Sequence, residues 1–377
     1  MIDAFTAHLP VRIRFGEGAI GELARLSAGR RVLVLTERPV LEIDAVATGV
    51  AGMPVYEKPP GEPTAQLVAE AAERIGADEP ELLVAIGGGS VLDLAKGARL
   101  VAGQGFPIER FLAGEAAIEP PRTPLVSIPT TSGTGSEVSG GVVLVDHAQR
   151  RKVGVAHPLL RAQDALVDPQ LTLGLPPEPT AWTGADALAQ AIGGVIVSNS
   201  NPPSVALGLE ACRHIAAGLE RAVVDGSDAA ARAEMSLGSL LAGLSMNLSD
   251  CGADHALGHA IGSTFDLPHG LTVGLVLAET LDVNRPACAG RLERVADALG
   301  GPDDDTGDGS RAITAVERLL AAISFPTLSQ AGVTDEDVGG LVELALADYC
   351  ITVNPRTWNA EDVRSAYAAA LALDGRH

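Results

Sequence analysis

A carboxylate, an amide and three imidazoles in the sequence have types and spacings that could hold a divalent metal ion. Asp186 and Gln190 are four residues apart in an alanine-rich run, so both would project from the same face of a helix. His255 and His259 have the same spacing, and His269 follows shortly after. One carboxylate and two imidazoles can bind a divalent ion and leave a coordination position open for substrate. The alternative is that each histidine is an ordinary packed residue of a helical core.

Two turns rich in glycine and hydroxyl groups could bind a nucleotide. Residues 87–90 (GGGS) lie between a predicted strand and a predicted helix, where backbone N–H groups point toward negative charge. A dinucleotide pyrophosphate would fit there, although such a turn also occurs without a ligand. Residues 129–137 (PTTSGTGSE) offer neutral donors for a phosphate, a ribose or a nicotinamide amide, or simply a helix cap. Ligands of open α/β sheets bind at the carboxyl ends of strands, so the two turns reinforce each other.

Glu37 is a candidate for contact with the adenosine ribose. It directly follows the predicted strand 31–35, and a carboxylate there could accept hydrogen bonds from both ribose hydroxyls. The same carboxylate would repel a 2′-phosphate, which favours NAD over NADP, although the adjacent Arg38 weakens this exclusion. The alternative is an ordinary surface glutamate.

The elements that must position these residues fall into two halves. Apolar runs at 31–35, 81–86 and 124–128 read as buried parallel strands, and residues 64–75 between the first two have helical spacing. A further strand pair is expected near 141–145 and 165–167. After residue 172 the chain becomes alanine- and leucine-rich, with helices predicted over 180–197, 204–224, 229–248, 255–265 and 271–283. The sequence therefore predicts an α/β dinucleotide-binding domain over 1–172 and an all-α helical domain for metal and substrate over 173–377.

Composition limits the classes of partner. The chain has 377 residues, 27 of them basic and 48 acidic, for a net charge of −21. Such a polyanion is unsuited to nucleic acid or to anionic membrane surfaces. Four well-separated cysteines and the lack of an apolar leader or spanning run predict reduced thiols and a cytoplasmic location. Only three basic residues are lysines, Lys58, Lys96 and Lys152.

Taken together, the motifs resemble the iron-dependent (group III) alcohol dehydrogenase family. They run in order over most of the chain: GGGSVLDLAKG, PTTSGTGSEV, DPQLTLGLPP, TGADALAQAI, HALGHAIG, PHG and NPRTWNAEDV. The resemblance implies a dinucleotide-binding α/β domain, a helical domain and an active site in the cleft between them. It also implies a homodimer and a set of cofactor-binding residues, namely Gly87, Gly88, Gly89, Ser90, Asp93, Thr130, Thr131, Thr134 and Lys152.

The metal site departs from the family pattern. The resemblance assigns ligand positions to Asp186, His255 and His269, but Gln190 stands where a histidine is usual, and Gly193 replaces a nearby glutamate. An amide oxygen is a weaker and harder ligand than imidazole, so iron affinity should fall and zinc becomes more plausible. Related glycerol dehydrogenases resemble this arrangement, with one Asp and two His around zinc. His259 matches the family's active-site histidine that does not bind the metal, and it suits a proton relay.

The expected activity is metal-assisted hydride transfer between NAD(P)H and a small aldehyde or ketone. Three alternatives stay open at this point. A metal-independent reductase similar to maleylacetate reductases would not use the metal site, and a cofactor-binding protein with a decayed site would not turn over. A lyase resembling dehydroquinate synthase would need a basic cluster around a substrate phosphate, and the helical half has no lysine.

Overall fold

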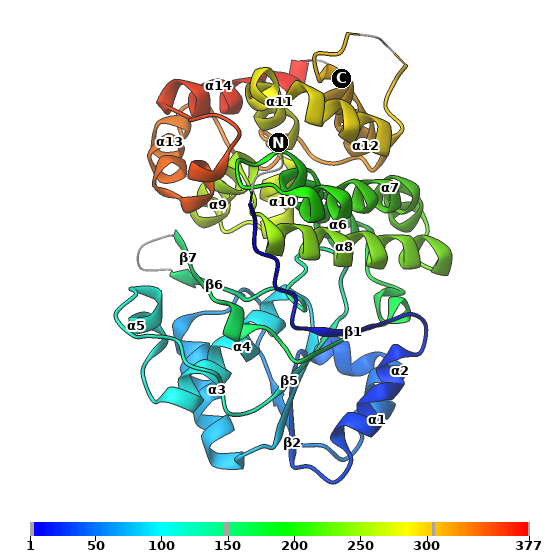
Figure 1. Cartoon of the computed structure of the whole chain (residues 1–377), viewed down its shortest axis with the longest axis vertical. Coiled ribbons are helices and arrows are strands. Elements are labelled where there is room, and N and C mark those ends of the chain that lie inside the picture. Colours follow the sequence, from blue (N-terminus) through cyan, green and yellow to red (C-terminus); the bar gives the residue numbers. More distant parts are fainter. Residues whose placement is uncertain (1–3, 147–150, 304–305, 376–377) are drawn as a thin grey trace. The chain divides into compact units, whose positions relative to one another are not determined.

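The protein is described by a computed structural model covering residues 4–146, 151–303 and 306–375 (Figure 1). Its contacts divide the chain into two compact units. The first unit contains residues 9–131 and 135–173, and the second contains residues 132–134 and 174–377 together with the segment ending at His8.

A six-stranded parallel sheet forms the centre of the first unit. Its strand order is β1-β8-β5-β4-β2-β3, and every adjacent pair is parallel. The strand bounds are β1 (Arg12–Phe15), β2 (Val32–Thr36), β3 (Val55–Glu57), β4 (Leu82–Gly87), β5 (Leu125–Pro129) and β8 (Asp164–Val167). The carboxyl ends of β2, β4 and β5 are adjacent, so the segments that follow them share one edge.

Helices cover both faces of this sheet (Figure 1). Alternate residues of a strand point to opposite faces. Leu33 and Leu35 of β2 therefore pack with α3 (Ala65–Asp78) and α4 (Gly89–Gln104). Val32 and Val34 pack on the other face, with α1 (Glu22–Ser27) and α2 (Asp44–Gly49). The unbroken apolar strands follow from this burial on both sides.

The strand expected near 141–145 lies outside the parallel sheet. Strand β6 (Gly141–Asp146) pairs antiparallel with β7 (Arg151–Ala156) in a separate two-stranded sheet. The strand expected at 165–167 is β8, which joins the main sheet between β1 and β5. The sequence located both strands but not their partners, since β6 pairs with the next strand along the chain and β8 pairs with the distant strands β1 and β5. The short helix α5 (Ile108–Leu112) completes the helices of this unit.

The second unit is helical. Its helices are α6 (Pro177–Ile196), α7 (Pro202–Val224), α8 (Ala229–Leu248), α9 (Ala253–Phe265), α10 (His269–Gly274), α11 (Leu277–Leu299), α12 (Ser310–Ala322), α13 (Val338–Ala347) and α14 (Ala360–Leu371). The single helix predicted over 271–283 is wrong, because the chain breaks at Leu275 and Val276 between α10 and α11. Short 3-10 helices occur in both units, at η1 (Ala19–Gly21), η2 (Arg38–Glu42), η3 (Pro158–Leu160), η4 (Pro169–Thr172), η5 (Tyr349–Val353) and η6 (Ala372–Gly375).

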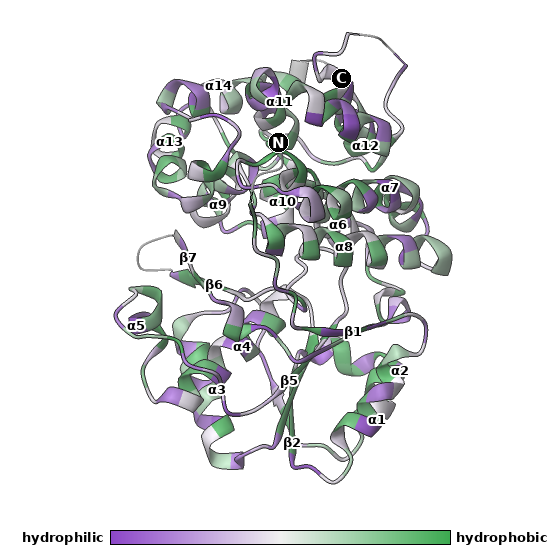
Figure 2. Cartoon of the chain, viewed as in Figure 1, coloured by the Kyte–Doolittle hydropathy of each residue, from purple (hydrophilic) through white to green (hydrophobic). Residues whose placement is uncertain are grey.

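The observed architecture confirms the predicted fold class, an α/β sheet unit followed by an all-helical unit. Figure 2 shows the central strands β2 and β5 as mostly hydrophobic, whereas the edge strand β1 carries hydrophilic residues. Within the residues that the structure describes, no helix has the length and apolar character needed to span a membrane.

Candidate active site

Three helices of the second unit bring the predicted metal ligands together. Asp186 lies on α6, His255 on α9 and His269 at the start of α10. One ligand atom from each lies within 4.8 Å of the others. Asp186 Oδ1 is 3.4 Å from His255 Nε2 and 3.6 Å from His269 Nε2. A single ion placed among these atoms could be bound by all three residues, as for a catalytic zinc or iron site.

Gln190 adjoins this cluster, as its spacing predicts. Its Nε2 donates a hydrogen bond of 3.0 Å to Asp186 Oδ1. Its Oε1 is buried and accepts no hydrogen bond from the described residues, and buried His255 Nε2 likewise has no hydrogen-bond partner there. An unpaired buried acceptor costs about 1–3 kcal/mol, so two of them beside a buried carboxylate call for a cation. The residues present therefore fit a divalent metal ion.

A close approach of α10 to α6 fixes the position of His269. Gly270, the next residue, lies so close to α6 that a Cβ on it would be 2.2 Å from the carbonyl oxygen of Trp182. The same Cβ would lie 3.2 Å from Cβ of Asp186. Only glycine allows this backbone contact, so residue 270 helps to set the separation between His269 and Asp186.

Asp254 orients His255. Its Oδ2 is 2.9 Å from His255 Nδ1, so Nδ1 carries the proton and Nε2 faces Asp186. Burial alone lowers the pKa of His255, but without an ion the carboxylates of Asp254 and Asp186 outweigh it and raise that pKa well above its usual value. A divalent ion would take the place of the second proton at Nε2. Because sequence neighbours rarely contact through their side chains on a helix, spacing gave no sign of this pair.

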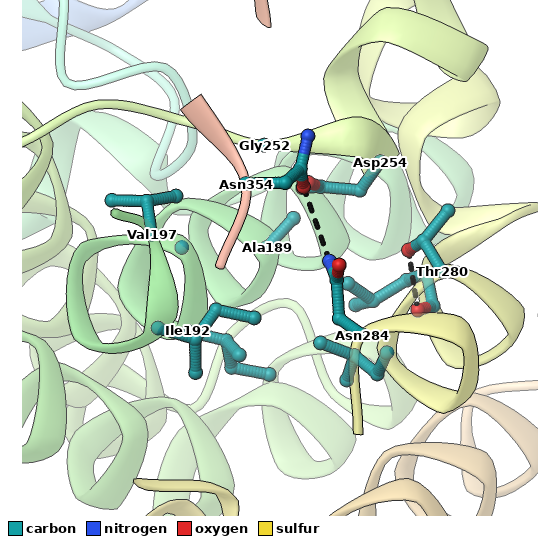
Figure 3. A pocket seen from close by; sticks show the side chains of 12 residues that line it. Ala189, Ile192, Val197, Gly252, Asp254, Thr280, Asn284 and Asn354 are labelled. Atoms are coloured by element: carbon teal, nitrogen blue, oxygen red, sulfur yellow. Dashed lines mark hydrogen bonds between the residues drawn. The ribbon is translucent and has the colours of Figure 1, made fainter. Parts of the chain in front are cut away.

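A small cavity lies beside Asp254, lined by residues of α6, α9, α11 and the segment after η5 (Figure 3). Its volume of about 10 Å³ has room for one water molecule. Asn284 and Asn354 line it and are hydrogen-bonded to each other at 3.1 Å. Gly193, which replaces a glutamate of the family pattern, also lines it. The cavity is too small for a carbonyl substrate, so it is not the substrate site.

His259 is held by a carboxylate that is distant in the sequence. Asp348 Oδ2 is 2.8 Å from His259 Nδ1, and Asp348 also accepts the backbone N–H of Cys350 at 2.8 Å. Burial raises the pKa of Asp348, but the hydrogen bond and charge of His259 outweigh it and lower that pKa to about 2. The His259 ring stacks on His269 with centroids 5.2 Å apart. Thus Nδ1 of His259 is tied to Asp348, and Nε2 is the nitrogen available for proton exchange.

The two predicted nucleotide turns lie side by side in the first unit. The N–H of Thr130 donates to the carbonyl of Gly87 at 3.1 Å. A Cβ on Gly88 would lie 3.5 Å from the Thr131 side chain. Helix α4 starts at Gly89, so its first N–H groups point out of the glycine turn. Ser132–Thr134 of the second turn groups with the helical unit instead, where Ser239 donates to the carbonyl of Gly133 at 3.2 Å.

All three lysines lie in the first unit and face carboxylates. Lys58 is 2.8 Å from Glu37, Lys96 is 2.9 Å from Asp93 and Lys152 is 3.4 Å from Glu62.

The carboxylate of Asp93 is already bound by other residues of the protein. Besides Lys96, it accepts the hydroxyl of Ser136 at 2.5 Å and the N–H of Val143 at 2.9 Å. These bonds order the segment after the second turn, and direct contact of Asp93 with a cofactor stays a prediction.

Comparison with known proteins identifies the family. The family description "Iron-containing alcohol dehydrogenase" matches residues 10–169, and "Fe-containing alcohol dehydrogenase family, C-terminal" matches residues 180–371. The chain is 36% identical to the probable alcohol dehydrogenase EutG of Escherichia coli (strain K12), over 85% of this chain and 80% of that protein. The chain belongs to the iron-containing alcohol dehydrogenase family.

Further members agree with this assignment. The 1,3-propanediol dehydrogenase of Citrobacter freundii is 32% identical, over 95% of this chain and 96% of that protein. Among solved structures, the sulfoacetaldehyde reductase of Bifidobacterium kashiwanohense in complex with NAD+ has a TM-score of 0.89 at 26% identity, over 98% of this chain and 99% of that chain. This iron-containing alcohol dehydrogenase family member is an oxidoreductase that interconverts alcohols and carbonyl compounds with NAD(P)H and a metal. The metal-independent and non-catalytic alternatives are not favoured.

Sequence reasoning missed three residues that hold the predicted ones in place. Asp254 and Asp348 orient histidines, and Lys58 contacts Glu37. The scarcity of lysine was a signal for Lys58. No pattern linked Asp348 to His259, because 89 residues separate them.

Proposed function

We propose that this protein is an NAD-preferring reductase of small aldehydes or ketones with a three-ligand metal site at Asp186, His255 and His269. The observation that carries this proposal is the convergence of those three residues, with the buried acceptor atoms Gln190 Oε1 and His255 Nε2 facing no donor among the described residues. Gln190 supplies the fourth protein position as an amide, which favours zinc or another hard divalent ion over iron. When bound there, the ion would polarise the substrate carbonyl.

The other residues have separate roles in this proposal. His259 exchanges a proton with the substrate oxygen through Nε2, and Asp348 is a positioning residue that holds its Nδ1. In the first unit, Gly87, Gly88, Gly89 and Ser90 would hold the pyrophosphate at the start of α4. Glu37 would bind the adenosine ribose, while Thr130, Thr131, Thr134 and Lys152 would flank the cofactor. Residues 1–172 would thus carry the dinucleotide, and residues 173–377 the metal and substrate.

Assembly and location belong to the same proposal. We expect a cytoplasmic homodimer, in keeping with four cysteines that form no disulfide. The sulfur atoms of Cys251 and Cys350 are 3.5 Å apart. We therefore expect these two cysteines to form a disulfide if the compartment were oxidising.

The decisive experiment is elemental analysis of the purified protein and of a Gln190→His variant. We expect about one zinc per wild-type chain, and a shift toward iron when imidazole replaces the amide. The matched control is Gln66→His on α3, in the other unit, which should leave metal content unchanged. Wild-type protein that holds no metal when fully active would overturn the proposal. An unchanged metal in Gln190→His would show that residue 190 is not a ligand.

A further inference from the structure

Lys58 is a buried cation next to the proposed ribose-binding carboxylate. It follows β3 directly, and its backbone N–H donates to Thr36 of the neighbouring strand β2 at 2.8 Å. This places Lys58 beside Glu37, the first residue after β2. The Lys58 side chain has 0% exposure, whereas Glu37 retains 27%. The cation is therefore covered, and the carboxylate is the part of the pair that solvent can reach.

The ammonium of Lys58 uses all three of its donors. Nζ donates to Glu37 Oε1 at 2.8 Å and to the carbonyl of Pro59 at 3.0 Å, and it also contacts the carbonyl of Gly61. Two of these acceptors are fixed backbone carbonyls, so the position of Nζ does not depend on Glu37 alone. The ammonium would stay in place if the carboxylate were removed.

Glu37 in turn divides its two oxygens. Oε1 accepts from Lys58 and, at 3.2 Å, from the hydroxyl of Ser90 in the glycine turn. Oε2 accepts no hydrogen bond from the part of the chain that the structure describes. Glu37 thus stands between a buried cation and the turn proposed to bind the pyrophosphate, with one oxygen available to a ribose hydroxyl.

We propose that Lys58 is a second determinant of coenzyme choice, a phosphate-binding cation that Glu37 masks. This rests on the proposed function, which places the adenosine ribose at Glu37. With Glu37 present, the ammonium is neutralised, and Oε2 repels the 2′-phosphate of NADP. Without the carboxylate, a phosphate oxygen can occupy the position of Oε1 and accept the hydrogen bonds of Lys58 and Ser90. Glu37 would then select NAD in two ways, because it repels the 2′-phosphate of NADP and it covers the ammonium of Lys58 that could bind that phosphate.

Two substitutions of Glu37 separate these effects. Glu37→Gln removes the charge but keeps an amide oxygen that can accept from Lys58, so the cation stays covered. Glu37→Ser removes both the charge and the cover. We expect Glu37→Ser to bind NADPH roughly tenfold or more tighter than Glu37→Gln does, the size of one charge-assisted hydrogen bond. Glu42→Gln, an exposed acid on η2, is the control for net charge and should change neither affinity.

The test measures dissociation constants of NADH and NADPH by titration calorimetry, which does not require turnover or a loaded metal. The variants Glu37→Ser/Lys58→Met and Glu37→Ser/Lys58→Arg are added, with a thermal denaturation curve for each. The Arg variant should keep the NADPH gain, and the Met variant should lose it. Equal NADPH affinities in Glu37→Ser and Glu37→Gln, or a gain that survives Lys58→Met, would overturn the role of Lys58 while leaving Glu37 at the ribose. If neither Glu37 variant alters either coenzyme's affinity, the proposed ribose position itself is wrong.

Discussion

Replacement of Gly270 by alanine tests whether the contact between α10 and α6 sets the metal site. The new Cβ would lie 2.2 Å from the carbonyl oxygen of Trp182, whereas Cβ atoms in proteins essentially never approach below 3.0 Å. The backbones must therefore separate by at least 0.8 Å. His269 and Asp186 are attached to these two backbones, and metal–ligand distances tolerate only about 0.2 Å.

Two consequences of Gly270→Ala can be measured. Overpacking of this kind typically costs about 1–3 kcal/mol of folding stability. Displacement of a ligand by several times its tolerance should also weaken metal affinity by at least the roughly 10–100-fold that mutation of an outer-shell residue commonly costs. The assays are metal content after dialysis against a graded chelator and a chemical denaturation curve.

The matched control is Gly339→Ala on α13. A Cβ there meets nothing within 4 Å, so alanine should leave metal retention unchanged and stabilise the helix by about 1 kcal/mol. Wild-type metal retention in Gly270→Ala would refute the reasoning, because His269 could then not be a ligand held by this contact. A loss of stability without any loss of metal would assign Gly270 to packing alone.

Three further predictions concern the buried carboxyl group of Glu137, the proton relay at His259 and the bound metal. Burial raises the pKa of Glu137 from 4.5 to about 7, so the wild-type fold loses stability as pH rises from 4.5 to 7. Glu137→Gln should remove this loss, so denaturant titrations should show the variant more stable than wild type by up to about 3 kcal/mol at pH 8 and equally stable at pH 4.5. A gain in stability that does not depend on pH would contradict this prediction. Asp348→Asn should lower kcat by up to roughly 100-fold with the KM for NADH unchanged, whereas Glu234→Gln, at the distant His214 pair, should leave kcat intact. Equal losses of kcat in Asp348→Asn and Glu234→Gln would count against a proton relay through His259. Prolonged chelation should abolish turnover while calorimetric NADH binding persists, and added zinc should restore it. Full activity after chelation would be incompatible with a metal-assisted reaction.

Local patterns in the sequence determined the elements and most of the candidate site. Apolar runs identified the central strands because these are buried on both faces. Helical spacing placed Asp186 with Gln190, and the clustering of histidines in the second half predicted the convergence now observed at Asp186, His255 and His269. The proposed nucleotide turns were found the same way, since a glycine run after a strand is a local feature.

Only the tertiary structure decided which charged groups contact and orient these residues. Asp348 orients His259 across 89 residues, and Lys58 reaches Glu37 because β3 pairs with β2. Strand β6 was expected to close the first half, but it pairs with β7 in a separate two-stranded sheet. Periodicity reports which face of an element is buried and not what it is buried against. A buried charge must find its partner wherever the fold brings one, so charge pairing is a property of the fold.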